Sequence, residues 1–368
     1  GSQNALAKKL ISATLGSAGV RIAGMVVTFL VGVQLARYLG PVGYGIYGTV
    51  MALVLILAVP AQLGLPQLLT RELSAYAEAE HYSRMKGAML VFAISIAVGC
   101  VVTVLIGYIA YHLWPQNKDA SFQSSFYWGL VNIPLVALLN VAVSALRGFH
   151  RVIAAQVYDG LVRPALFAIF LVSTFFFSAH LDAALAIALQ VLAGLLALLM
   201  SVIHLFRIVP KQVMEVRASR HDSEWVASSV PMAGTEVLRI YDGQYVVLLL
   251  GALASIEDVG IFRVALAAAV FVGLPSTIIN VVVMPYVAQL HAAGQRHQMQ
   301  MVATGSAVMM FFGSAVLTLI FFLFGERLLS LIFGEAFAPA WIPLALMSVA
   351  YTINGFFGSA PTILNMFG

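Results

Sequence analysis

The chain has 368 residues, of which 61% are hydrophobic and only 9% are charged, whereas a soluble domain carries about 25% charged residues. This composition excludes an ordinary soluble protein and predicts an all-α polytopic membrane protein. The single cysteine, Cys100, excludes an intramolecular disulfide and a thiolate metal cluster. The net charge of +4 does not indicate nucleic-acid binding, because the basic residues gather at the borders of apolar runs, where they report membrane topology.

Uninterrupted apolar runs predict ten membrane spans. In chain order the spans run over about 11 to 38, 42 to 67, 85 to 113, 123 to 146, 153 to 178, 183 to 206, 226 to 251, 259 to 290, 299 to 324 and 339 to 366. We expect an N-terminal lobe over 1–210, a cytoplasmic linker forming an amphipathic helix over 211–225, and a C-terminal lobe over 226–368.

Basic residues are distributed unequally between the two sets of alternate connections. The set that includes the N-terminus holds twelve lysines and arginines, whereas the other set holds only Arg37, Lys118 and Arg327. Because cytoplasmic loops are enriched in positive charge, the N-terminus is predicted to be cytoplasmic. Arg37 is expected to anchor a helix end.

The seventh predicted span carries Glu236, Arg239 and Asp242 in its middle. A helix of this length is roughly 39 Å long and crosses a bilayer core of about 30 Å. The spacing of three residues places the charges on one side of the helix. Each charge at that depth costs about 2.5–3.5 kcal/mol on an insertion scale, so such residues usually line a cavity on the path of a solute. This pattern predicts a membrane transporter.

Three further arginines fall inside predicted spans. Arg21 lies about 15 Å into the first span, too deep for easy snorkelling, and is expected to line the lumen. Arg163 follows Asp159 by four residues, so it either lines the lumen or forms a simple helical ion pair at the cytoplasmic interface. Arg263 either lines the cavity or snorkels to the outer interface.

Three acidic residues are candidates for ion coupling: Asp242, Glu236 and Asp159. A carboxyl group within the bilayer that exchanges one environment for another binds and releases a proton. The alternative is that one of these acids only compensates Arg239, and sodium coupling also stays open.

An internal repeat with an offset of 215 residues aligns Gly45 with Gly260 and Pro60 with Pro275. It predicts two pseudo-symmetric lobes in the same orientation with a central site between them. The first lobe has six predicted spans and the second only four. We therefore expect the natural chain to continue past Gly368.

Residues 35–47, LARYLGPVGYGIY, resemble the Wzx-type polysaccharide flippases of the multidrug/oligosaccharidyl-lipid/polysaccharide exporter superfamily. Residues 146–148, LRG, and residues 331–337, LIFGEAF, add to the resemblance. It implies a V-shaped pair of lobes in the bacterial inner membrane that carries a polyprenyl-diphosphate-linked oligosaccharide to the outer leaflet by alternating access. The implied partners are this lipid, the membrane lipids and other membrane proteins of glycan assembly, with no nucleic acid.

The substrate's diphosphate needs cations, so Arg21 and Arg239, with Arg163 and Arg263, are the predicted substrate contacts. No GxxxxGK[ST], HExxH or CxxC pattern occurs, so we expect neither an enzyme nor a cofactor beyond a coupling H⁺ or Na⁺. Two alternatives stay open. One is a peptidoglycan-precursor flippase or drug exporter of the same superfamily, although the first span here holds Arg21 and no acid, whereas the drug exporters carry an acidic site in that span. The other is a membrane-embedded polymerase or acyltransferase, which the short outer loops disfavour.

Overall fold

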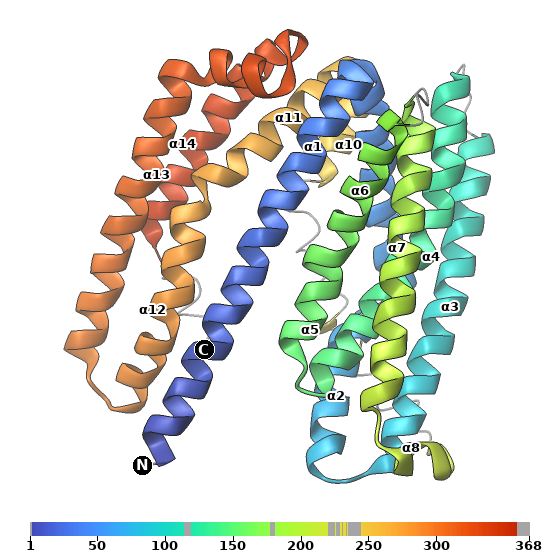
Figure 1. Ribbon diagram of the computed structural model, residues 1–368, viewed down its shortest axis with the longest axis vertical. Coiled ribbons are helices and arrows are strands. Elements are labelled where there is room, and N and C mark those ends of the chain that lie inside the picture. The colour runs from blue at the N-terminus through green and yellow to red at the C-terminus, as the bar shows by residue number, and fades with distance from the viewer. Residues whose placement is uncertain are drawn as a thin grey trace. The chain divides into compact units, whose positions relative to one another are not determined.

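The computed structural model describes residues 2–113, 119–176, 181–219 and 244–358, together with Trp225, Ser229, Pro231, Met232 and Gly234. In these residues every regular element is a helix, as Figure 1 shows. Seven of the described helices are long and apolar enough to cross a membrane, or eight if one bent pair counts as a single span. The protein is therefore a multi-pass membrane protein.

The structure describes fifteen helices. In chain order they are α1 (Ser2–Gln62), α2 (Leu65–Glu78), α3 (Tyr82–Leu113), α4 (Ala120–Gly148), α5 (Val152–Val157), the π-helix η1 (Tyr158–Val162), α6 (Arg163–Phe176), α7 (Ala183–Ile208), α8 (Lys211–Glu215), α10 (Gln244–Leu253), α11 (Ile256–Val272), α12 (Leu274–Ala292), α13 (Arg296–Phe333), the 3₁₀ helix η2 (Glu335–Ala340) and α14 (Trp341–Phe357).

The helices follow the predicted spans closely, with one difference in how they are joined. The first two predicted spans are both present in α1, which consists of two helices joined by a kink at Gly40 (φ 64°, ψ 179°), a conformation that glycine adopts without strain. The predicted span over 259–290 is a pair of helices, α11 and α12, bent by 41°. More than half of the seventh predicted span lies outside the described residues, and its last part is seen as α10. The count of ten spans stays a prediction.

Local sequence sets several helix ends. Gly64 has a left-handed conformation (φ 71°) and lets the chain turn from α1 into α2, whose first turn contains Pro66. The Asp182 carboxylate accepts a hydrogen bond of 2.7 Å from the Leu185 backbone and caps the start of α7. At the other end of the chain α13 stops at Gly334, which has a φ of 109°.

Contacts between helices divide the chain into two compact units. The large unit consists of Gly19–Val31 and Val42–Val259, and the small unit consists of Gly1–Ala18, Gly32–Pro41 and Gly260–Gly368. Helix α1 thus contributes to both units. The predicted lobes over 1–210 and 226–368 stay a prediction.

In the large unit, α4 packs against α7, α2 and α3 (Figure 1). Helix α2 was not predicted as a separate element, because the second predicted span ends at residue 67. It has one apolar face, formed by leucines that are almost fully buried; these are Leu65, Leu68, Leu69 and Leu73. This face lies against Phe92 and Ile96 of α3 in one hydrophobic cluster, so burial rather than membrane insertion stabilises α2.

In the small unit, α13 packs between α12 and α14. The Arg37 guanidinium, from the α1 part of this unit, donates hydrogen bonds to the carbonyl oxygens of Ile332 (2.7 Å) and Leu331 (2.5 Å) in the last turn of α13. A cation stabilises a helix C-terminus, where the carbonyl groups have no partner within the helix. The prediction that Arg37 anchors a helix end is confirmed.

Of the predicted amphipathic helix over 211–225, the described residues are helical over Lys211–Glu215 and at Trp225, whereas residues 216–219 are not helical. The Lys86 ammonium of α3 donates hydrogen bonds to the carbonyl oxygens of Met214 (2.8 Å) and Val216 (2.9 Å). These bonds take up carbonyl groups that a longer helix would have used, so the segment lies in contact with α3.

Beyond α8 the chain stays attached to the start of α3. The Ser219 backbone N–H donates to the Ser83 carbonyl oxygen at 3.0 Å, and the Ser219 carbonyl oxygen lies against Gly87, where any side chain would collide with it. Trp225 is only 3% exposed and packs edge-on against Phe92 at 5.3 Å. The linker is therefore fixed on the large unit by polar contacts at one end and by an aromatic contact at the other.

Candidate functional site

A π-helical turn interrupts the fifth predicted span, which the structure shows as one membrane-length segment over Val152–Thr174. Pro164 has no N–H group, so it cannot donate to the Gly160 carbonyl four residues earlier. The residue before it, Arg163, donates its N–H to the Tyr158 carbonyl five residues earlier, which is the bonding pattern of a π-helix. Such π-turns inside helices occur frequently at functional sites.

Asp159 and Arg163 form an ion pair on this turn, with 3.4 Å between Arg163 Nη2 and Asp159 Oδ1. About one third of each side chain is exposed, 35% for Asp159 and 32% for Arg163. The i,i+4 pair that the sequence predicts is therefore present. Arg163 is the twelfth of the 23 residues in the segment Val152–Thr174, so the pair lies near the middle of this membrane-length helix. Its role in a transport lumen stays a prediction.

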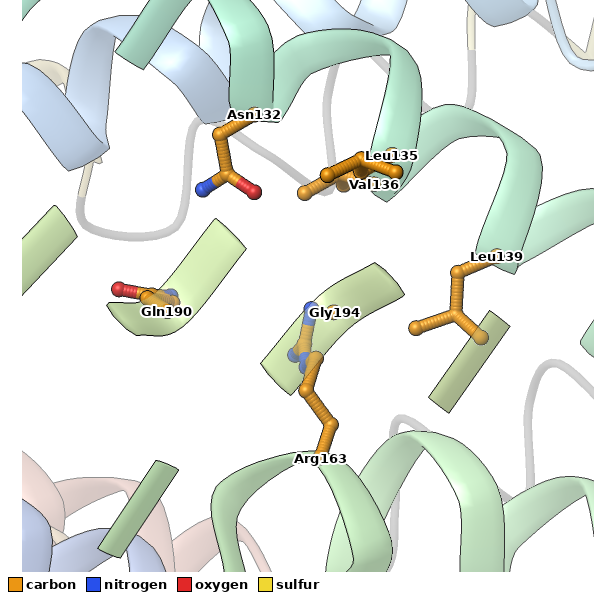
Figure 2. Close-up of a pocket in the computed structure, with 7 residues that line it drawn as sticks. All are labelled: Asn132, Leu135, Val136, Leu139, Arg163, Gln190 and Gly194. Carbon is orange, nitrogen blue, oxygen red and sulfur yellow. The ribbon is translucent and has the colours of Figure 1, made fainter. Parts of the chain in front are cut away.

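Next to the ion pair lies a small pocket between α4, α6 and α7 (Figure 2). Counted with its open side the space is about 200 Å³, but the helices pack too closely there to leave room for a water molecule. The pocket is lined by Asn132, Leu135, Val136, Leu139, Arg163, Gln190 and Gly194. Figure 2 shows the Arg163 guanidinium pointing across the pocket toward Gly194, with the amides of Asn132 and Gln190 at its other end.

Two hydrogen bonds connect this pocket to α1. The Tyr47 hydroxyl donates to Gln190 Oε1 at 2.5 Å, and the Asn132 amide nitrogen donates to the Met51 sulfur at 3.6 Å. A thioether is only a weak acceptor, so the hydrogen bond of the Asn132 amide nitrogen is weak although the residue is only 2% exposed. The sequence analysis missed both amides. The signal was there, because each lies near the middle of an apolar span, where polar groups are costly.

Helix α1 also touches the π-helical turn directly. A Cβ atom built on Gly24 would lie 2.1 Å from the Gly160 carbonyl oxygen, so only glycine allows this approach of the two backbones. The oxygen is the one that Pro164 cannot satisfy, and Cα–H groups make weak hydrogen bonds to such carbonyls. Arg21 precedes Gly24 by three residues, which puts it on the same side of α1, and its side chain is exposed.

The structure brings together only part of the predicted site. Arg163 and Asp159 are in contact, and Arg21 lies on the α1 face that approaches their turn. Arg263 belongs to α11 in the small unit and is partly exposed. Arg239, Glu236 and Asp242 lie outside the described residues. The predicted substrate contacts and ion-coupling residues therefore stay predictions.

In the part of the chain that the structure describes, membrane-length helices with an ion pair and amides inside their spans define a polytopic membrane protein. The family described as "Polysaccharide biosynthesis protein" matches residues 6–291 of the chain. The protein belongs to this family, and the resemblance to Wzx-type flippases is confirmed. A comparison with curated proteins finds no match.

Several solved structures share the fold. An inward-facing conformation of a multidrug resistance MATE family transporter of the MOP superfamily is 13% identical, with a TM-score of 0.67 over 94% of this chain and 86% of that chain. An outward-facing conformation of such a transporter is 15% identical, with a TM-score of 0.61 over 96% and 83% of the two chains. A structure of the MATE multidrug transporter DinF-BH is 13% identical, with a TM-score of 0.56 over 97% and 84%. At these identities the likeness shows the fold alone.

Proposed function

We propose that this protein is a flippase that moves a polyprenyl-diphosphate-linked oligosaccharide from the cytoplasmic to the outer leaflet of the bacterial inner membrane, with its N-terminus in the cytoplasm. The observation that carries the proposal is the family match over residues 6–291 on a chain with a MATE-like fold. Transport proceeds by alternating access. Other membrane proteins of glycan assembly supply the lipid on one side and receive it on the other.

Arginines inside the spans support the choice of a diphosphate lipid. Arg21 lies within the membrane-length stretch of α1 and is exposed, so it has a charge available for a ligand. The guanidinium group makes bidentate hydrogen bonds to phosphate oxygens, which the ammonium group of lysine cannot match. Arg239 is the second proposed diphosphate contact, and Arg163 and Arg263 are the further proposed substrate contacts.

Ion coupling is assigned to Asp242, with Glu236 and Asp159 in support. The Asp159–Arg163 pair supports a role for charge exchange, because a conformational change that separates the two groups leaves the carboxylate without its cation. A proton or a sodium ion then takes the place of the guanidinium. The Asp242→Asn variant is expected to transport without dependence on an ion gradient, and unchanged gradient dependence would assign the coupling to another residue.

The substrate is tested with purified protein in liposomes that contain a lipid-linked oligosaccharide diphosphate. Arg21→Ala and Arg239→Ala should each weaken binding of this lipid by about tenfold to a hundredfold, the loss expected for one charge-assisted contact, and should change binding of an uncharged lipid-linked sugar much less. Arg71→Ala is the matched control, because Arg71 pairs with Glu72 on the surface of α2. Failure of the parent protein to bind or move any such diphosphate lipid would overturn the proposal.

A further inference from the structure

We infer that Arg151, Arg207 and Lys211 form a binding site for the headgroup of an anionic phospholipid such as phosphatidylglycerol. The site belongs to the large unit and lies at the membrane border where α5 begins and α7 ends (Figure 1). It concerns a lipid that the protein binds, so it is independent of the proposed transport of a diphosphate lipid.

A contact between α7 and the π-helical turn brings the cations to one place. The Tyr158 hydroxyl lies 3.0 Å from His204 Nδ1, and the two rings meet edge-on at 5.7 Å. The segment that contains the turn and α7 are antiparallel neighbours (Figure 1). Because a helix rises by about 1.5 Å per residue, Arg151 and Arg207 lie about 10.5 and 4.5 Å from this contact, toward the same end of the pair. Lys211 follows in the turn after α7.

Apolar packing fixes the backbone that carries the two arginines. Leu146 is fully buried in a cluster against which Leu205 and Ile208, on either side of Arg207, are packed. The Leu146 carbonyl oxygen also accepts a hydrogen bond of 2.9 Å from the Arg151 backbone N–H. Both arginines therefore extend from segments that are held on the same cluster.

The site has an excess of positive charge. Its three cationic side chains are exposed, and none of them forms an ion pair among the described residues. The acids nearest to them in the sequence are Asp159, which is already in an ion pair, and Glu215, which is exposed and forms no ion pair in the described part of the chain. The three cations therefore favour an anion from outside the chain.

Exposed apolar side chains beside the cations indicate that this anion belongs to a lipid. Val152 and Ile153 at the start of α5 are 46% and 41% exposed, and Ile203 and Phe206 near the end of α7 are 53% and 62% exposed. In a membrane these side chains contact acyl chains, while arginine and lysine at the border meet the phosphate groups. The positions of cations along the chain report topology, but the pairing of unpartnered cations with exposed apolar residues on two packed segments favours a lipid molecule.

Two kinds of membrane lipid carry phosphate groups that suit such a site, the bulk phospholipids and the polyprenyl diphosphates. The exposed apolar residues open the site to the surrounding bilayer, so it exchanges lipid with the bulk. Occupancy rises with the concentration of the ligand, and an anionic phospholipid is a bulk component of the membrane whereas a polyprenyl diphosphate is an intermediate. We therefore assign the site to the phospholipid.

The test titrates the purified full chain in detergent with phosphatidylglycerol or with phosphatidylethanolamine of the same acyl chains, and native mass spectrometry counts the bound lipids. The parent should bind its first phosphatidylglycerol about fivefold or more tightly than phosphatidylethanolamine. Arg151→Gln, Arg207→Gln and Lys211→Gln should each weaken binding of phosphatidylglycerol by about three- to tenfold, the effect of one cation at an anionic membrane surface. Binding of phosphatidylethanolamine should stay within about twofold.

Arg84→Gln is the matched control, because it removes the same charge from an exposed arginine at the start of another helix, α3. It should change binding of phosphatidylglycerol by less than about twofold. Arg207→Lys keeps the charge and should retain more of the affinity than Arg207→Gln.

Three results would overturn the inference. The first is a parent that binds the two phospholipids equally. The second is a loss in Arg84→Gln as large as in the site variants, since general attraction to positive charge would then explain the binding. The third is that polyprenyl diphosphate without sugar binds to the parent more than about tenfold tighter than phosphatidylglycerol and loses this advantage in the site variants, which would assign the site to the diphosphate lipid.

Discussion

The contact between Gly24 and Gly160 leads to a sharp prediction about stability. In Gly24→Ala the added Cβ would lie 2.1 Å from the Gly160 carbonyl oxygen and 3.0 Å from its carbon, whereas an ordinary contact begins at 3.4 Å. Relief requires a shift of about 1.3 Å, the difference between 3.4 and 2.1 Å. The atoms that collide belong to the backbone, so no change of side-chain rotamer can relieve the contact. We expect α1 to move away from the π-helical turn.

The magnitude follows from two opposing effects. Overpacking of a close-packed contact costs about 1–3 kcal/mol, and a backbone collision lies toward the upper end of that range. Replacing glycine by alanine within a helix returns up to about 1 kcal/mol. The net loss of stability is therefore about 1–2 kcal/mol. For a unit of this size each kcal/mol lowers the unfolding temperature by about 2–4 °C, which gives a decrease of about 2–8 °C.

Thermal unfolding of the purified protein in one detergent measures this effect, with Gly19→Ala as the control. Gly19 lies on the same helix and in the same unit, and nothing is within 4 Å of its added Cβ, so this variant should unfold at or above the parent temperature. Pro164→Ala supplies the backbone N–H group that can donate to the Gly160 carbonyl oxygen, and it should let the turn relax toward an α-helix. The double variant Gly24→Ala with Pro164→Ala should therefore lose less stability than the sum of the losses in the two single variants. Equal unfolding temperatures for the two glycine variants would refute the reasoning.

Three further outcomes concern the two units separately. Arg37→Gln should lower the stability of the small unit by about 1 kcal/mol, because it removes the cation that donates hydrogen bonds to the carbonyl oxygens of Leu331 and Ile332 at the end of α13. Trp225→Ala should destabilise the large unit by about 3–5 kcal/mol and make the linker more sensitive to limited proteolysis, since a 3%-exposed indole that donates to the Tyr76 hydroxyl at 3.3 Å is removed. Burial raises the pKa of Tyr76 above its ordinary value of 10.0, and a hydrogen bond to Glu72 raises it further. The neutral phenol therefore contributes stability that is complete below pH 10 and is lost as the pH rises through the raised pKa.

Each of these outcomes has a control in the chain. Arg327 is exposed on α13 and has no partner among the described residues, so Arg327→Gln should leave unfolding unchanged, and an equal loss in both arginine variants would contradict the role of Arg37. Trp128 is 42% exposed, so Trp128→Ala should cost far less than Trp225→Ala. Tyr76→Phe should remove part of the loss of stability above pH 10. An unchanged alkaline profile in this variant would assign that loss to other groups.

The sequence determined most of the helical pattern, because membrane spans depend on local composition. An apolar run must satisfy its backbone hydrogen bonds within itself, so its length and hydropathy alone predict a helix. The same holds for the i,i+4 pair of Asp159 and Arg163, which a single helix brings together. It does not hold for the linker after Lys211, where hydrogen bonds to Lys86 of another helix end α8 early.

Only the tertiary structure decided which polar groups meet. Asn132 and Gln190 are 58 residues apart in the sequence and line one pocket only because α4 packs on α7. The contact between Gly24 and Gly160 depends in the same way on how α1 lies against a carbonyl group that Pro164 leaves free. The sequence showed a proline and several glycines but not which of them face each other. Helix formation is a local balance of hydrogen bonds and hydropathy, whereas the pairing of helix faces depends on the shapes of surfaces formed by residues far apart in the chain.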